Sequence, residues 1–247
     1  MKSNLLTPLP TLGSVCMLCQ STPPIQKSHL WPKFAVEWLK LNSSPYIRRG
    51  DKLNQRLEDV TTFPLLCLKC ENIFSRFEQK FCELIFKPFQ ENRNTPFFYY
   101  EEWLSHFAIS LVWRMLAIDF ERFVSEHPEQ VVSASNAFEY WRGYLLGSGT
   151  SIEPYRHHMF FFSLVEPSQS AIQNLPSKFH SYILRSFDGC IGSFYSKGFV
   201  YVLLPGIAFW SPLNIRDDVG WGKNSHIKQR GKFKVAQKVK DERFGAL

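Results

Sequence analysis

The chain lacks any apolar run near the length of about 20 residues that a membrane-spanning helix needs. The segment Met1–Pro10 has one lysine and two prolines but no continuous apolar stretch, so it does not fit a secretory signal peptide. We therefore expect a soluble, cytoplasmic protein with no membrane partner.

The sequence also lacks internal repeats, long low-complexity linkers, a glycine-rich phosphate-binding loop and the Gly-x-Ser-x-Gly motif of many hydrolases. Its 247 residues, 45% hydrophobic and 21% charged, are typical of one large globular domain or two modest ones. The 23 phenylalanines indicate a core rich in aromatic rings, although some rings could instead stack on nucleic-acid bases.

Positive charge is concentrated near the C-terminus and accounts for most of the net charge of +7. The basic residues of this segment are Lys223, Lys228, Arg230, Lys232, Lys234, Lys238, Lys240 and Arg243. The acidic residues there are Asp241 and Glu242. This pattern favours either a solvated basic tail or an arm that contacts phosphates, and it leaves the two open.

Four of the six cysteines form two Cys-x-x-Cys pairs, Cys16 with Cys19 and Cys67 with Cys70. Each pair can supply two thiolates from one tight turn, and four thiolates complete the tetrahedron that zinc prefers. A chain in a reducing compartment keeps its thiols free for this role. We therefore predict a structural zinc ion, with Cys82 and Cys190 as buried, inert thiols.

The expected elements change along the chain from helices to strands. The apolar spacing predicts helices over residues 33–41, 71–90, 100–125 and 134–146, with a loop over 42–51. Aromatic and β-branched runs predict strands over residues 159–165, 180–185, 190–195 and 199–204. The predicted fold class is α+β, with a zinc-bound domain over residues 1–90 and a helical plus β-rich domain over 91–247.

The first cysteine pair, followed by Ser28-His29-Leu30-Trp31-Pro32 and then by a Cys-x-x-Cys that opens a helix, resembles the HNH endonucleases with a ββα-metal core. Ser-His-Leu-x-Pro-x-Phe together with Leu-Leu-Cys-x-x-Cys-Glu is similar to a divergent HNH-like branch associated with bacterial and phage-conflict genes. The segment Phe107–Arg114 also resembles part of that branch. The likeness is specific over about residues 15–82 and implies a treble-clef zinc site.

In such a family the motif histidine, here His29, is the general base, and one divalent ion, Mg²⁺ or Mn²⁺, binds the scissile phosphate. The chain departs from the usual pattern in having Ser28 before this histidine and Glu71 after the last cysteine, both at metal-ligand positions. Thr61 and Thr62 lie near the place of the middle asparagine. A carboxylate suits a hard cation, so Glu71 can replace the usual ligand.

Glu78 lies two helical turns after Glu71, about 10 Å away by helix geometry, which is too far to ligate the same ion. Its predicted role is to orient a water or His29.

The resulting prediction is a metal-dependent DNA endonuclease with phosphate contacts from Arg48, Arg49, Lys228, Arg230, Lys232 and Lys234. A regulatory protein partner would restrain such an activity. Two alternatives stay open: a degenerate zinc-finger module that only binds nucleic acid, and a subunit that docks a partner through residues 100–247.

Overall fold

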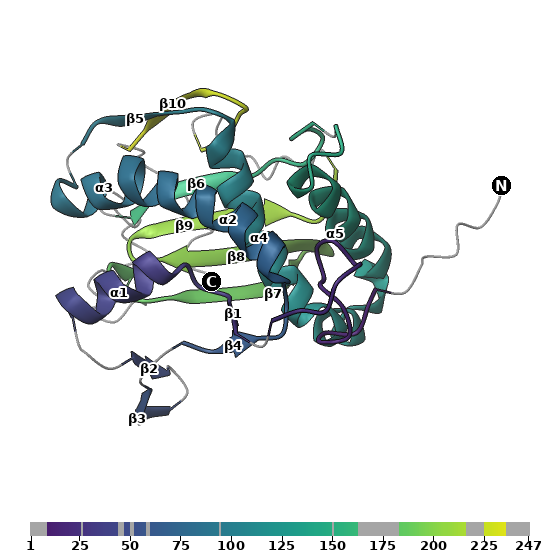
Figure 1. Cartoon of the computed structure of the whole chain (residues 1–247). Coiled ribbons are helices and arrows are strands. Elements are labelled where there is room, and N and C mark those ends of the chain that lie inside the picture. The colour runs from purple at the N-terminus through teal and green to yellow at the C-terminus, as the bar shows by residue number, and fades with distance from the viewer. Residues whose placement is uncertain are drawn as a thin grey trace.

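The computed structural model describes residues 9–25, 27–43, 47–49, 52–57, 60–93, 95–149, 151–162, 183–215 and 225–235; for residues 47–49, 52–57 and 234 it describes the backbone alone. This part of the chain is a mixed α+β structure with antiparallel sheets, as predicted (Figure 1). Within it, no helix is both long enough and apolar enough to cross a membrane.

The N-terminal part contains a short antiparallel pair of strands, β1 (Ser28–His29) and β4 (Thr62–Phe63), with His29 opposite Thr62. The chain between them forms helix α1 (Lys33–Asn42) and a hairpin of β2 (Ile47–Arg49) and β3 (Lys52–Leu57). The predicted helix over 33–41 is confirmed. The predicted loop over 42–51 is wrong at β2, because pairing with β3 gives this segment its extended form.

A long helical stretch follows β4. It consists of α2 (Leu68–Phe81), a π-helical turn (Cys82–Phe86) and α3 (Lys87–Glu91). The helix predicted over 71–90 is confirmed in outline, but it begins earlier because Cys67 is its N-cap residue. Pro88, which has no N–H to donate, lies in the first turn of α3, a position where a helix tolerates proline.

Two further helices, α4 (Glu102–Glu126) and α5 (Val131–Leu145), confirm the predicted helical section; a short 3-10 turn, Pro128–Gln130, joins them. Helices α2 and α4 lie across one face of a four-stranded sheet (Figure 1). The strand order is β6–β9–β8–β7, all antiparallel.

The bounds of these strands are β6 His158–Phe161, β7 Asp188–Phe194, β8 Lys197–Leu204 and β9 Ile207–Pro212. Three of the predicted strands correspond to β6, β7 and β8, whereas β9 was not predicted. The strand predicted over 180–185 is wrong for residues 183–185, which form a turn, and residues 180–182 lie outside the described part.

A separate two-stranded ribbon pairs β5 (Phe97–Tyr100) with β10 (Gly231–Lys234). Neither strand was predicted. The segment interpreted as a basic tail is thus a strand over residues 231–234, because Phe233 buries its ring and packs against Tyr100 and Phe161.

One hydrophobic core joins the N-terminal and C-terminal parts, and it includes residues from Cys16 to Val235. At its centre Phe81 of α2 stacks on Phe107 of α4 with 4.0 Å between ring centroids, and Phe209 of β9 lies 5.7 Å from Phe81. The domain boundary predicted at residue 90 falls inside α3.

Candidate metal centre and active site

The two cysteine pairs meet in one cluster. The sulfurs of Cys16, Cys19, Cys67 and Cys70 all lie within 4.8 Å of one another. The Cys19 and Cys67 sulfurs are 3.9 Å apart, close to the spacing of about 3.8 Å that follows from zinc–sulfur bonds of about 2.3 Å in a tetrahedron. All four are free thiols. The geometry confirms a site that could hold a metal such as zinc.

Backbone hydrogen bonds hold the two cysteine turns against each other. The N–H of Met17 donates to the Leu65 carbonyl at 2.9 Å, and the N–H of Ile25 donates to the Leu66 carbonyl at 2.7 Å. Cys67 caps α2, whose positive dipole end favours a thiolate. Cys16 and Cys19 thus lie on a tight turn, and Cys67 and Cys70 lie at the N-terminal end of α2.

The four thiols differ in their ease of ionisation. Burial raises the pKa of Cys19, but hydrogen bonds from Ser21 and Thr22 outweigh this effect and lower the pKa to about 5. Burial raises the pKa of Cys16, and burial together with the neighbouring thiols raises that of Cys70. The cluster therefore retains protons in the absence of a cation, and metal binding would release them.

His29 is half-buried on β1. Its neighbour Ser28 is buried; the Ser28 hydroxyl accepts from the Leu66 N–H at 3.0 Å and donates to the Leu66 carbonyl at 3.5 Å. The serine that was predicted as a possible metal ligand thus joins β1 to the segment before α2. The strand register also brings Thr62 opposite His29, while Thr61 is exposed.

Glu71 lies in the first turn of α2, one residue after the last cysteine. One of its carboxylate oxygens, Oε1, is buried and has no hydrogen-bond partner within the described part of the chain. An acceptor without a donor is suited to a cation. Among the described residues, however, only the four cysteines form a group of three or more His, Cys, Asp or Glu side chains close enough to hold a metal ion. His29 and Glu71 therefore do not belong to a second group of this kind.

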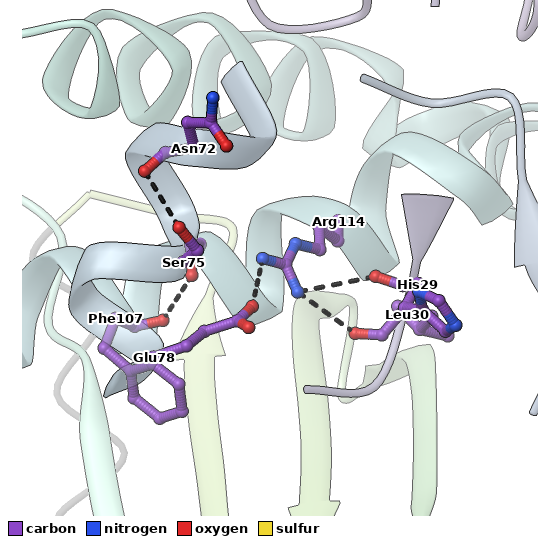
Figure 2. Close-up of polar contacts among 8 residues, drawn as sticks. His29, Leu30, Asn72, Ser75, Glu78, Phe107 and Arg114 are labelled. Atoms are coloured by element: carbon purple, nitrogen blue, oxygen red, sulfur yellow. Dashed lines mark hydrogen bonds and ion pairs between the residues drawn. The ribbon is translucent and has the colours of Figure 1, made fainter. Parts of the chain in front are cut away.

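The structure adds a residue that the sequence did not single out as functional. Arg114 of α4 is buried, and its Nη2 donates to Glu78 Oε1 at 2.5 Å. Its Nη1 lies 3.4 Å from the His29 carbonyl oxygen and 3.5 Å from that of Leu30 (Figure 2). Glu78, predicted to orient a water or His29, is paired with this arginine. The sequence signal that could have identified Arg114 is its position as a charged residue within the apolar stripe of the helix predicted over residues 100–125.

The predicted phosphate-contacting residues lie in two places. Arg48 and Arg49 are in β2, but their side chains are outside the described part, as is that of Lys234 and the segment from residue 236 onward. Lys228, Arg230 and Lys232 are exposed near or on β10. The Lys232 ammonium lies 3.4 Å from the centroid of the Phe97 ring and 5.5 Å from that of Tyr99.

Comparison with known proteins gave no relative: no family model, no curated protein and no solved structure matches the chain. The described residues define a mixed α+β chain with a four-cysteine cluster that could bind zinc.

Proposed function

We propose that the chain is an HNH-like endonuclease that hydrolyses phosphodiester bonds in DNA, and that it acts as an effector in bacterial conflict with phages. The observation that carries this proposal is the order of β1, β4 and α2. His29 lies on β1, which pairs with the antiparallel strand β4, and α2 is the next element after β4. The cysteine cluster joins the turn before β1 to the start of α2. This order supports a ββα-metal core with a treble-clef zinc site.

In the proposed reaction His29 takes a proton from water, and the resulting hydroxide forms a bond to phosphorus. The bond from phosphorus to the leaving oxygen breaks, and that oxygen gains a proton from solvent. Histidine is the side chain most often used as a general base in catalysis. A Mg²⁺ or Mn²⁺ ion, when bound, would stabilise the negative charge that develops on the phosphate.

Glu71 is the residue that would hold this ion, because its buried Oε1 has no donor among the described residues. A single protein carboxylate fits the chemistry, since Mg²⁺ commonly keeps several waters and binds one or two carboxylates together with substrate phosphate. The cysteine cluster would have a different task. Four thiolates would fill the coordination sphere of zinc and leave no open position, so a zinc ion held there would be structural.

The test is cleavage of plasmid DNA with Mg²⁺ or Mn²⁺ by the full chain and by His29→Ala. We expect the variant to lose about 10²- to 10⁴-fold in rate, because general base catalysis contributes about that much. Zinc content and melting temperature should stay near wild type. His127→Ala is the matched control, since His127 caps the C-terminal end of α4, on a different element. Wild-type cleavage by His29→Ala would refute the assignment.

A second candidate is a nucleic-acid-binding module without catalysis. The observation that favours it is the Ser28 hydroxyl, which bonds to Leu66 where the family has an anionic ligand. DNA binding without cleavage by the wild type, under either metal and over a range of pH, would favour this candidate over the nuclease.

A further inference from the structure

Arg114 is an unusual residue for the inside of a helix–sheet core. Its side chain is 2% exposed, and its Glu78 partner is 18% exposed. Its guanidinium also lies over the Phe74 ring at 4.8 Å from the centroid. Because removing two charges from water is costly, a buried pair of this kind contributes little net stability compared with apolar side chains of the same volume. Its position therefore calls for a reason other than stability.

The remaining contacts of Arg114 point to that reason. Its Nη1 is shared between the carbonyl oxygens of His29 and Leu30, which are 85 and 84 residues away in the sequence. Strand β1 is only two residues long, so its own ladder with β4 fixes His29 weakly. The hydrogen bonds between Ser28 and Leu66 fix the backbone just before His29. The contacts of Arg114 with the carbonyls of His29 and Leu30 fix the backbone at His29 and just after it.

We propose that Arg114 is a positioning residue for His29, with Glu78 as the counter-ion that orients the guanidinium. This inference rests on the proposed nuclease function. The guanidinium fixes the carbonyl side of His29, while the imidazole points away from Arg114 (Figure 2). The planar guanidinium of arginine donates to Glu78 and to the two carbonyls at once. The ammonium of a lysine, on its flexible side chain, does not reproduce this geometry.

The experiment compares Arg114→Lys and Glu78→Gln with the wild type. Lysine keeps the charge but loses the fork, and glutamine keeps an acceptor but loses the charge. We expect kcat for DNA cleavage to fall by up to about 10²-fold with KM nearly unchanged, as for a catalytic group displaced by about 1 Å. Leu204→Ala, a buried residue of β8, is the control: it should lower the melting temperature without lowering kcat.

A second measurement needs no catalysis. The His29 imidazole resonances, assigned by their loss in His29→Ala, should shift or broaden in Arg114→Lys and in Glu78→Gln but not in Leu204→Ala. Unchanged resonances in both variants would overturn the positioning role, as would wild-type kcat in both. If the wild type cleaves nothing yet these resonances move, the nuclease proposal fails while the positioning of His29 by Arg114 is supported. Glu78→Gln provides the test if Arg114→Lys does not fold.

Discussion

His157, just before β6, is a buried histidine outside the proposed site. Its Nδ1 lies 2.7 Å from the Ser211 hydroxyl, and its Nε2 has no hydrogen-bond partner within the described part of the chain. Burial, with smaller effects from His158 and His226, lowers its pKa to about 3. In the unfolded chain the same group would take up a proton near pH 6.5. Between these values the unfolded state binds more protons, so the free energy of unfolding decreases as the pH decreases.

The prediction concerns His157→Asn, which can keep the hydrogen bond to Ser211 and does not titrate. Between pH 7 and pH 5 the wild type should lose about 2 kcal/mol more of its unfolding free energy than the variant does, from the linkage of one proton. Urea unfolding at the two pH values, with zinc content followed in both proteins, measures this difference. Equal losses in the two proteins would mean that His157 does not remain neutral in the folded state.

Glu71→Gln tests whether the free carboxylate oxygen serves a metal. An amide oxygen is a weaker ligand for Mg²⁺ because it carries no charge. We therefore expect cleavage at low metal to fall about 10-fold or more, with partial recovery as Mg²⁺ or Mn²⁺ is raised. Glu83→Gln, at an exposed position in the π-helical turn, is the matched control and should show the wild-type metal dependence. A loss of rate that no metal concentration restores would assign Glu71 another role.

At the scale of elements, the β5–β10 ribbon presents aromatic rings and positive charge together. Tyr99 is 68% exposed and lies opposite Lys232 in the register, while Phe98 and Tyr100 face inward. Bases stack on exposed rings, and lysine neutralises phosphate. The exposed Lys228 and Arg230 precede β10, whereas Glu101 and Glu102 follow β5 at one end. We expect this face to contact DNA along the basic strand.

The test is binding of a labelled single-stranded DNA by His29→Ala protein without added Mg²⁺ or Mn²⁺, so that cleavage plays no part and the cysteine cluster keeps its metal. Tyr99→Ser should weaken binding by about 1–3 kcal/mol if a base stacks on the ring. Lys232→Gln should flatten the slope of log affinity against log salt by about 0.7 for single-stranded DNA. Tyr195→Ser is the control for ring exposure, since Tyr195 is 85% exposed in the β7–β8 turn. Equal effects of the two substitutions on DNA affinity would show that the β5–β10 ribbon is not the DNA-binding face.

The sequence predicted the long helices well because their apolar spacing extends over several turns, as in α4. It predicted the cysteine cluster because zinc chemistry demands a particular spacing of soft ligands. The short strands could not be predicted in the same way. Strands β1 and β4 contain two residues each and exist through their pairing with each other. Likewise β10 depends on the burial of Phe233, and the role of Glu78 depends on Arg114 in another helix.

For the whole molecule, the shared core predicts that zinc has effects far from the cysteines. The free energy of metal binding at a structural site contributes directly to the free energy of folding. We therefore expect about one zinc per chain and loss of cooperative unfolding when the zinc is removed. Arg142 of α5 donates to the Leu18 carbonyl at 3.1 Å, which links the cysteine turn to the helical section. The near-ultraviolet circular dichroism of the buried Trp113 and Trp141 should therefore change on chelation. A zinc-free chain that keeps this signal would contradict the prediction.

The same core makes a fragment experiment informative. Residues 91–247 expressed alone should expose the face of α4 that packs on α2, including the ring of Phe107, which stacks on Phe81 in the intact chain. We expect this fragment to aggregate or to unfold without a cooperative transition. A soluble fragment with a sharp transition would show that the boundary near residue 90 separates two units that fold on their own.

The separation between His29 and Arg114 has a consequence for how the protein is made. During synthesis the ribosome completes both cysteine pairs by residue 70, whereas the guanidinium that holds the His29 carbonyl is added 85 residues after that histidine. Closing this long loop requires α4 to pack against α2 and β1, which local contacts alone do not bring about. A nascent chain could thus bind its metal early, while the geometry of its histidine is completed only when α4 is in place.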